Sequence, residues 1–544
     1  MIKKNDLFEA EITAMTAEGS GICRADGMAV FVPGTAVGDR CVVRVVKVLK
    51  KYAFGRLEEL LTPSPDRTTP DCPIAGPCGG CVYRHITYEA ELKIKTQRVR
   101  DALERIGGFE NIPMEPILGA PSRTRYRNKC QLPIGLSKNG EMQMGFYAVN
   151  SHRIIDTHTC LLQPEVFDRA AEAFRAWQKL SGESIYDEAA HSGVLRHLYM
   201  RCGEKSGEVL VCIVANGAKL HREDLLVKML REAVPEITGI VLNINRERTN
   251  VVLGRELRTL WGKPTIRDTL CRLEFEISPH AFYQVNRTQA EALYNKAAEY
   301  AGLTGAETLL DLYCGTGTIG LSMASRAKKL IGAEIIPSAV ENARKNAAHN
   351  HVTNAEFLCG DAKDAAHILY ERGERPDVII IDPPRKGCDA AVISTIAAMR
   401  PTRVVYVSCD PATLARDLKQ FTAEDYNIEA VTPVDMFPGT AHVETVVQLV
   451  RKKPDTYIDI TVDMDELDLM SSEAKATYEE IKDYIFERFG LKVSSLNIAQ
   501  VKTKCGIIER GNYNKPKSEN TKQPQCMKDK EETIMNALRH FKMI

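Results

Sequence analysis

The sequence predicts a multidomain α/β protein with four parts. Its 544 residues exceed what one hydrophobic core usually supports. From about residue 300, short apolar segments alternate with helical ones, which is typical of a doubly wound, Rossmann-like parallel sheet. The pattern of the first sixty residues instead predicts short strands separated by glycine turns, which is typical of a small barrel. We therefore expect a small OB-like β-barrel at 1–60, a central α+β domain at 61–265, a Rossmann-like domain at 266–453 and an appended helical and basic extension at 454–544.

The composition is that of an ordinary globular protein. Hydrophobic residues make up 44% of the chain and charged residues 26%, with 72 basic and 72 acidic side chains. A net charge of zero says nothing about nucleic acid, because only local basic patches would bind it. No stretch approaches the ~18 apolar residues of a membrane span, and we expect no secretory signal at the start. The 16 cysteines then favour a cytoplasmic protein in which clustered cysteines bind metal or do chemistry.

The predicted barrel carries a basic patch on its later strands. The patch consists of Arg40, Arg44, Lys47, Lys50, Lys51 and Arg56, with Tyr52 and Phe54 between the charges. Such a mixture suits backbone phosphates and stacked bases of a nucleic acid. The alternative is a solvated sheet edge that its charges protect from aggregation.

A cysteine cluster follows a proline-rich linker at 63–70. Cys72, Cys78 and Cys81 lie close in the sequence, and Cys160 is a plausible fourth member. The spacing allows structural zinc, an iron–sulfur cluster or partly coincidental cysteines. Helices are predicted over 87–106 and about 167–180, within a mixture of short strands.

Five apolar strands are predicted in the Rossmann-like domain. They cover 308–311, 330–334, 357–359, 378–382 and 403–409. Continuous apolar runs are typical of strands that are buried on both faces. Polar residues stand at their carboxyl ends, where open α/β sheets bind ligands.

The first of these strands leads into a glycine-rich turn that contains Gly315 and Gly317. Glycines let a cofactor approach the backbone without a Cβ clash, and Glu334 after the next strand can accept hydrogen bonds from both ribose hydroxyls. No Walker lysine follows this turn, which disfavours a phosphate cradle. An adenosyl cofactor without phosphates fits better.

The fourth strand ends at Asp382-Pro-Pro-Arg385. Two prolines cannot continue a ladder, so they form a stiff turn that holds Asp382 at the sheet edge. This motif resembles the Asp/Asn-Pro-Pro-aromatic motif of amino-group methyltransferases, whose aromatic residue stacks on a flipped amino base. Arg385 stands at the position of that aromatic residue. The alternative is a rigid turn without a further role.

The fifth strand ends at Cys409, and Glu444 precedes a final apolar strand. Most cysteines after apolar strands are buried packing groups. A nucleophile and a separate base that face one adenosyl cofactor nevertheless fit a specific reaction. A thiolate adding at carbon 6 of uracil makes carbon 5 nucleophilic enough to take a methyl group, and a base then removes the carbon 5 proton. We expect Cys409 to be the nucleophile and Glu444 the base.

These motifs together resemble the RNA uracil-C5 methyltransferases. The matching pieces are Phe282-Tyr-Gln284-Val-Asn286, Asp311-Leu-Tyr-Cys-Gly-Thr-Gly, Asp382-Pro-Pro-Arg, Ser408-Cys409-Asp-Pro and His442-Val-Glu444-Thr. The resemblance implies S-adenosyl-L-methionine as cofactor, with Gln284, Tyr313, Glu334 and Asp382 in contact with it or beside it. Asp361 and Thr318 stand where related proteins often carry asparagine, and we include Asp361 among the expected cofactor contacts.

The cysteine cluster is similar to the four-cysteine [4Fe–4S] site of the branch that modifies 23S ribosomal RNA, and residues 1–60 resemble the TRAM domain of that branch. The resemblance implies Cys72, Cys78, Cys81 and Cys160 as ligands and 23S rRNA as partner, with no membrane and no obligate protein partner. We expect Arg125, Arg127 and Lys129 to contact RNA phosphates.

Three other functions stay open at this point. A tRNA uridine-C5 methyltransferase would share the chemistry, although that branch lacks the TRAM domain and the cluster. A cytosine-C5 methyltransferase also uses thiolate addition, but its nucleophile normally follows proline, whereas Cys409 follows Ser408. The remaining alternative is a non-catalytic RNA-binding or redox-sensing iron–sulfur protein.

The last ninety residues lie outside this resemblance. A helix is predicted over 472–489, with Tyr478, Ile481, Ile485 and Phe489 on one stripe, and a second element over 493–505. The stretch 502–528 loses periodicity and is basic, which favours a flexible segment.

Overall fold

The computed structural model describes residues 2–452, 477–505, 528–541 and 543. The chain divides into two compact units, Met1–Lys453 and Pro454–Ile544. Within the described residues, no helix is long and apolar enough to cross a membrane.

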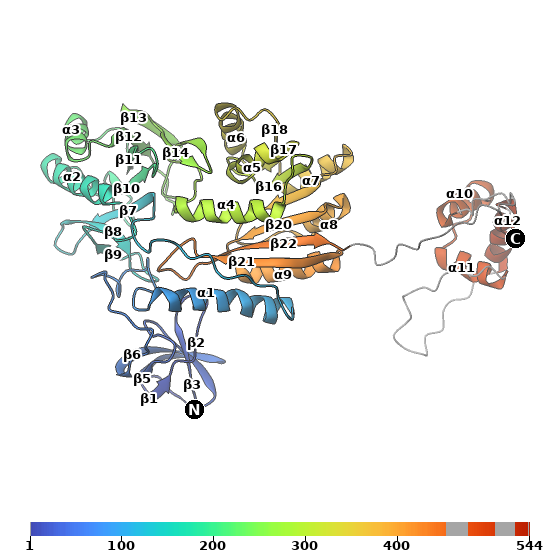
Figure 1. Cartoon of the computed structure of the whole chain (residues 1–544), viewed down its shortest axis with the longest axis horizontal. Helices are drawn as coiled ribbons and strands as arrows, with labels where there is room; N and C mark the ends of the chain where they lie inside the picture. Colours follow the sequence, from blue (N-terminus) through green and yellow to red (C-terminus); the bar gives the residue numbers. More distant parts are fainter. Residues whose placement is uncertain (1, 453–476, 506–527, 542, 544) are drawn as a thin grey trace. The chain divides into compact units, whose positions relative to one another are not determined.

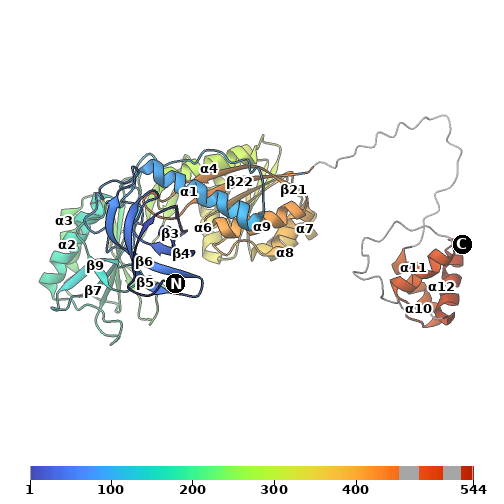
Figure 2. The same ribbon diagram turned by 90° about the horizontal axis from the view of Figure 1, so that it is seen from below.

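The first unit begins with a curled six-stranded sheet that has its own apolar core (Figure 2). Its strands are β1 (Leu7–Glu11), β2 (Ala14–Met15), β3 (Gly21–Ala25), β4 (Met28–Val32), β5 (Arg40–Val48) and β6 (Tyr52–Thr62), in the order β1-β5-β6-β4-β3-β2. Alternate residues such as Val30, Val32, Val43 and Val45 are fully buried, as the period of a strand requires. The expected short strands with tight turns are therefore present.

A long helix follows the barrel. Helix α1 (Tyr88–Ala102) begins at Thr87, whose side chain accepts a hydrogen bond from the Ala90 N–H, and it continues as a π-helical turn over Leu103–Gly107. Gly108 then ends the helix in the left-handed conformation. The sequence predicted these bounds closely but not the π-helical turn.

The central part is built on a second, seven-stranded sheet. Its strand order is β13-β12-β11-β10-β7-β8-β9, and α2 (Glu165–Ser181) and α3 (Glu223–Ala233) supply apolar residues to its core. The strands are β7 (Lys129–Leu136), β8 (Met142–Tyr147), β9 (Ile154–Asp156), β10 (Leu195–Cys202), β11 (Val209–Ala215), β12 (Ile237–Ile244) and β13 (Glu256–Gly262). A two-stranded hairpin, β14 (Ile266–Leu270) and β15 (Leu273–Ile277), leads into the third sheet region.

The third sheet has the order β18-β17-β16-β19-β20-β22-β21. Its strands are β16 (Thr308–Leu312), β17 (Lys329–Glu334), β18 (Ala355–Cys359), β19 (Val378–Ile381), β20 (Arg403–Ser408), β21 (Tyr426–Val434) and β22 (Glu444–Arg451). The first five are parallel and β22 runs antiparallel to its neighbours. The five apolar runs in the sequence thus form the predicted strands to within two residues at each end.

Helices cover both faces of this sheet (Figure 1). One core contains residues of α4 (Arg287–Ala301), α5 (Thr318–Met323) and α6 (Pro337–His349). The other contains residues of α1, α7 (Ala362–Glu371), α8 (Ala390–Met399) and α9 (Pro411–Ala423). The strand order reverses between β16 and β19, so the carboxyl ends of these two strands flank the crevice where such folds bind ligands.

The second unit contains three described helices. They are α10 (Tyr478–Phe489), α11 (Ser495–Lys504) and α12 (Lys528–His540), and Ile481, Ile485, Ile498 and Val501 are buried among them with residues of α12. The first two helices were predicted, whereas α12 was not. Most of the basic stretch 502–528 lies outside the described residues.

Candidate active site

The turn after β16 has a backbone that only particular residues adopt easily. Tyr313, Gly315 and Gly317 all have positive φ angles, of 66°, 57° and 81°. A Cβ at Gly317 would lie 3.1 Å from a methyl of Leu321, whereas a Cβ at Gly315 would meet nothing within 4 Å. The backbone at Gly315 is therefore open on one side, as a cofactor-binding turn requires.

Glu334, at the end of β17, fixes this turn. Its carboxylate accepts hydrogen bonds from the Gly315 N–H (3.1 Å) and the Ile336 N–H (2.9 Å). The predicted ribose-binding carboxylate is thus oriented beside the glycine turn.

Asp311 is a site residue that sequence reasoning missed. Its Oδ2 accepts a hydrogen bond from the Gly320 N–H at 2.9 Å, while its buried Oδ1 has no partner among the described residues. Burial raises the pKa of this carboxyl to about 7. The available signal was a lone carboxylate inside an apolar strand, directly before the glycine turn.

Cys409 and Glu444 meet at the carboxyl end of β20. Ser408 pairs with Thr445 in the antiparallel ladder between β20 and β22, so Cys409, which follows Ser408, and Glu444, which precedes Thr445, lie at the same edge of the sheet. Asp410 then caps α9 by accepting hydrogen bonds from Ala412 N (2.9 Å) and Thr413 N (3.0 Å). The sequence-predicted nucleophile and base are therefore neighbours.

The electrostatics around this pair disfavour the charged form of both side chains. Burial raises the pKa of the Cys409 thiol to about 11, and the nearby carboxylates Glu444 and Asp382 add to the effect. Burial, followed by Asp382, raises the pKa of Glu444 to about 8. The Arg385 guanidinium acts in the opposite direction on both groups. A bound cation would favour the charged forms.

The other expected cofactor residues have mixed environments. Asp382 follows β19 and shares the edge with Cys409 and Glu444, and burial raises the pKa of its carboxyl. Burial also raises the pKa of the Tyr313 hydroxyl. Gln284 is half-buried, and its backbone oxygen accepts a hydrogen bond from the Asn128 side chain at 2.8 Å. The Asp361 carboxylate caps α7 by accepting from Lys363 N at 2.9 Å, which leaves fewer lone pairs for a ligand.

The loop 437–441, which leads to Glu444, is held by distant parts of the chain. Lys95 Nζ donates to the Phe437 carbonyl at 3.1 Å, and Tyr126 Oη donates to the Pro438 carbonyl at 2.9 Å. The Gly439 carbonyl accepts hydrogen bonds from the N–H groups of Val82 (2.8 Å) and Tyr83 (3.1 Å). The Arg98 guanidinium donates to the Ala441 carbonyl. Val82 directly follows Cys81. The loop that precedes the base is thus bonded to the segment that contains the cysteine cluster.

A buried ion network supports the same loop. Lys95 on α1 is 1% exposed, and its Nζ lies 2.7 Å from Glu91 Oε1 and 2.6 Å from Asp435 Oδ1. Glu91 Oε1 also accepts the Gly439 N–H at 2.6 Å, and Tyr88 donates to Asp435 at 2.7 Å. The carboxylates are fully buried, so they depend on these partners.

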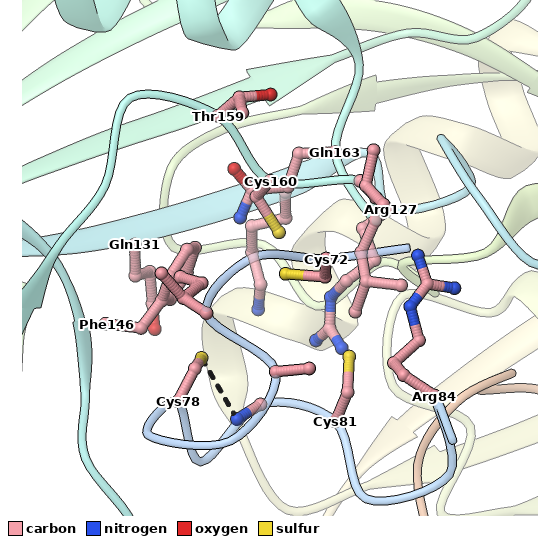
Figure 3. A pocket seen from close by; sticks show the side chains of 16 residues that line it. Cys72, Cys78, Cys81, Arg84, Arg127, Gln131, Phe146, Thr159, Cys160 and Gln163 are labelled. Carbon is pink, nitrogen blue, oxygen red and sulfur yellow. Dashed lines mark hydrogen bonds between the residues drawn. The ribbon is translucent and has the colours of Figure 1, made fainter. Parts of the chain in front are cut away.

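The four predicted ligand cysteines line one cavity of about 250 Å³ (Figure 3). Cys72, Cys78 and Cys81 come from the loop before α1, and Cys160 comes from the segment between β9 and α2. The Gly80 N–H donates to Cys78 Sγ at 3.4 Å. No group of three or more His, Cys, Asp or Glu side chains has the spacing of a metal-ion site in the part of the chain that the structure describes. The thiols surround a space instead of one point.

Positive charge surrounds this cavity. Arg84, Arg127 and Lys129 contribute to its lining, and the buried Nη2 of Arg84 has no hydrogen-bond partner among the described residues. Burial, with Arg201 and Arg127 nearby, lowers the pKa of Lys129 to about 8. The lining of the cavity thus combines four thiols with three basic side chains.

Several basic residues expected at RNA have internal contacts instead of free charges. The Arg125 guanidinium donates to the Cys160 carbonyl (3.0 Å) and the Gln163 carbonyl (2.6 Å), and it pairs with Asp168. In the barrel patch, Arg44 and Arg56 both pair with Glu58 at 2.9 Å. An RNA contact at Arg125 stays a prediction that would require these bonds to be shared or broken.

Comparisons with known proteins agree with this arrangement. The family model described as tRNA (Uracil-5-)-methyltransferase matches residues 263–452, and the TRAM domain model matches residues 4–57. An uncharacterized RNA methyltransferase of Halalkalibacterium halodurans is 44% identical over 451 residues, which cover 83% of this chain and 98% of the relative. A second one, from Clostridium tetani, is 43% identical over 446 residues, with 82% and 96% covered.

A solved structure extends the likeness to three dimensions. The tRNA (uracil-54, C5)-methyltransferase of Pyrococcus abyssi, in complex with S-adenosyl-L-homocysteine, has a TM-score of 0.67 and 29% identity to this chain, and the match covers 81% of this chain and 99% of that one. The Rossmann-like domain, its glycine turn and these relatives define an RNA methyltransferase. More narrowly, the chain belongs to the RNA uracil-C5 methyltransferase family and carries an N-terminal TRAM domain.

Proposed function

We propose that this protein transfers a methyl group from S-adenosyl-L-methionine to carbon 5 of a uridine in 23S ribosomal RNA, in the cytoplasm. The observation that carries the proposal is the position of Cys409 and Glu444 directly beyond the Ser408–Thr445 pair at the carboxyl edge of the sheet, in a chain of this family. A thiol and a carboxyl at one edge of the sheet match the two roles that carbon 5 methylation needs.

In the proposed reaction, the Cys409 thiolate adds to carbon 6 of the uracil and the electron pair of the 5,6 double bond moves to carbon 5. Carbon 5 would then take the methyl group from the sulfonium of a bound cofactor, whose S–CH3 bond breaks to leave the thioether S-adenosylhomocysteine. Glu444 then removes the remaining proton from carbon 5, the double bond re-forms and the thiolate leaves carbon 6. The thiol and the carboxylate are thereby free for the next turnover after Glu444 releases its proton.

Arg385 supports the charged forms that this reaction needs. Its guanidinium lowers the pKa of both Cys409 and Glu444, against the effect of burial. The arginine in Asp382-Pro-Pro-Arg therefore has an electrostatic use that an aromatic residue could not supply.

The cofactor would lie against the turn after β16. Gly315 offers an open backbone, Glu334 offers carboxylate oxygens beside it, and Asp311 has an unpartnered buried oxygen nearby. Gln284, Tyr313, Gly317, Asp361 and Asp382 complete the proposed set of cofactor residues.

The cysteine cavity would hold a [4Fe–4S] cluster through Cys72, Cys78, Cys81 and Cys160. Four thiols spread around a cavity suit a cubane cluster better than a single zinc ion, which draws its ligands to ~2.3 Å from one point. The unpartnered nitrogen of Arg84 and the cations Arg127 and Lys129 suit the negative charge of such a cluster. We assign it a structural role, since the thiolate reaction contains no redox step.

The proposal is tested by incubating the purified protein with a tritiated methyl donor and either 23S rRNA or tRNA, followed by mapping of the modified base. We expect 5-methyluridine in 23S rRNA, no product with Cys409→Ala, and a protein–RNA adduct on a denaturing gel with Glu444→Gln. Methylation of tRNA alone would overturn the substrate, 5-methylcytosine would overturn the base, and full turnover by Cys409→Ala would overturn the mechanism.

A further inference from the structure

Three aromatic side chains form a cluster on the outside of the N-terminal barrel (Figure 2 labels its strands β4 and β6). The ring centroids of Phe31 and Tyr52 are 5.2 Å apart, those of Tyr52 and Phe54 are 5.6 Å apart, and those of Phe31 and Phe54 are 6.0 Å apart. Each ring therefore contacts the other two. We refer to these three residues as the aromatic platform.

The strand period shows that the platform faces away from the core. Val30, Val32 and Ala53 are fully buried, and Phe31, Tyr52 and Phe54 are the residues that alternate with them on β4 and β6. Phe31 and Phe54 stand directly opposite each other in the parallel pairing of these strands. Phe54 is 38% exposed, so a contiguous π surface reaches the solvent.

Three exposed lysines border the aromatic platform. Lys47 stands opposite Phe54 in the β5–β6 pairing, and Lys50 and Lys51 lie in the turn between these strands. All three lysines are exposed, and none forms an ion pair within the described residues. Arg44 and Arg56 differ, since both form an ion pair with Glu58.

We propose that the aromatic platform is a binding site for unpaired RNA bases, separate from the methyl-transfer site, with Lys47, Lys50 and Lys51 as contacts for the adjoining phosphates. The inference deepens the proposed function, because it rests on an RNA substrate. Aromatic rings bordered by lysines bind single strands in barrels of this kind, because every base offers a face for stacking and every linkage offers a negative charge. A double helix hides the faces of its bases, so the site should select single-stranded segments.

A purely structural cluster is the competing explanation, because cross-strand aromatic pairs also stabilise sheets. The experiment therefore separates stacking from packing at one position. Phe54→Leu retains an apolar side chain without a π face, and Phe54→Trp retains the π face. Leu61→Ala removes a 40% exposed apolar side chain on the same strand and serves as the matched control.

Each full-length variant is titrated against a fluorescein-labelled single-stranded RNA of about twelve nucleotides, and anisotropy is recorded. We expect Phe54→Leu to bind roughly 5- to 150-fold more weakly than the unchanged protein, the range for loss of one stacked base. Phe54→Trp and Leu61→Ala should bind within twofold of it, and RNA should quench the indole fluorescence that F54W introduces. Equal binding by Phe54→Leu, or weak binding by Phe54→Trp without quenching, would overturn the proposal.

Salt dependence tests the lysines independently. Changing Lys47, Lys50 and Lys51 together to Gln should reduce the slope of log K against log salt by about 2, which is ~0.7 for each lost phosphate contact on a single strand, while Phe54→Leu leaves it unchanged. An unchanged slope in the triple variant would remove the lysines from the site. Failure of methyl transfer to 23S rRNA by the unchanged protein would contradict the proposed function but would leave these binding measurements valid.

Discussion

The ion network between α1 and the loop before Glu444 allows one prediction to be worked from distances. Lys95 is the only cation within 3 Å of both Glu91 and Asp435 among the described residues, and all three side chains are at most 1% exposed. Lys95→Met keeps the apolar stem but leaves two buried carboxylates without their shared cation. Removing one partner of a buried pair costs ~3–5 kcal/mol, because the charge left behind cannot return to water.

The same change should affect catalysis through the loop. Lys95 also donates to the Phe437 carbonyl at 3.1 Å, and the loop that it holds leads directly to Glu444. A displaced base slows removal of the carbon 5 proton more than the earlier addition of Cys409. We therefore expect Lys95→Met to accumulate a protein–RNA adduct, while its affinity for the cofactor product S-adenosylhomocysteine stays unchanged.

The measurements are the thermal midpoint of the full chain and the fraction of adduct on a denaturing gel. Lys93→Met is the matched control, because Lys93 is exposed on the same helix and should shift stability by at most ~0.5 kcal/mol. A neutral triple variant, Lys95→Met with Glu91→Gln and Asp435→Asn, should regain much of the lost stability. An equal thermal midpoint for Lys95→Met and Lys93→Met, together with an equal fraction of adduct, would refute the role of Lys95.

Four further predictions concern other parts of the molecule. Resolution of the adduct should accelerate with pH up to about 8, because Glu444 must be ionised to take the proton and its pKa is raised to about 8; a rate that is flat from pH 6 to 9 would contradict this. The folded state holds that proton where the unfolded state, with a pKa of ~4.3, has lost it, so Glu444→Gln should gain stability relative to the unchanged protein as pH rises from 5 to 8. Cys78→Ser should lose iron and the broad visible absorption of the anaerobically purified protein, whereas Cys359→Ser, an exposed thiol elsewhere, should retain both; stoichiometric zinc in the unchanged protein would contradict the cluster. Deletion of 454–544 should leave methyl transfer to a short RNA loop intact, since the Halalkalibacterium halodurans relative is 98% covered without an equivalent unit of this length; loss of turnover on that loop would place the segment in the catalytic domain.

The parallel sheet was predictable because its signal is local. Runs such as Val378–Ile381 are apolar at every position, and only strands buried on both faces tolerate that pattern. The residues after those strands were predictable for a related reason, because topology brings the carboxyl ends of parallel strands to one edge. To propose catalytic roles for Cys409 and Glu444, one must also know a reaction that uses a thiol and a carboxylate together.

Contacts between distant segments were not predictable in the same way. Lys95 and Asp435 are separated by 340 positions, and nothing in the sequence around either residue indicates the other. The hydrogen bond from Arg125 to the Cys160 carbonyl joins residues 35 positions apart and was likewise not predictable, while the RNA contact of Arg125 stays a prediction. Helix α12 was missed because it follows a basic stretch without periodicity. Its few apolar residues are buried against α10 and α11, which the sequence around α12 does not indicate.

The ladder between β20 and β22 determines how this enzyme can change without losing its chemistry. The distance from thiol to carboxylate depends on the pairing of Ser408 with Thr445, which buried strands hold, and not on the helix and strand that connect the two residues in sequence. Residues inserted between α9 and β21 would therefore be tolerated at the surface. One residue inserted within β22 would instead turn every side chain on one side of the insertion to the opposite face of the sheet, and this shift of register would separate Cys409 from Glu444.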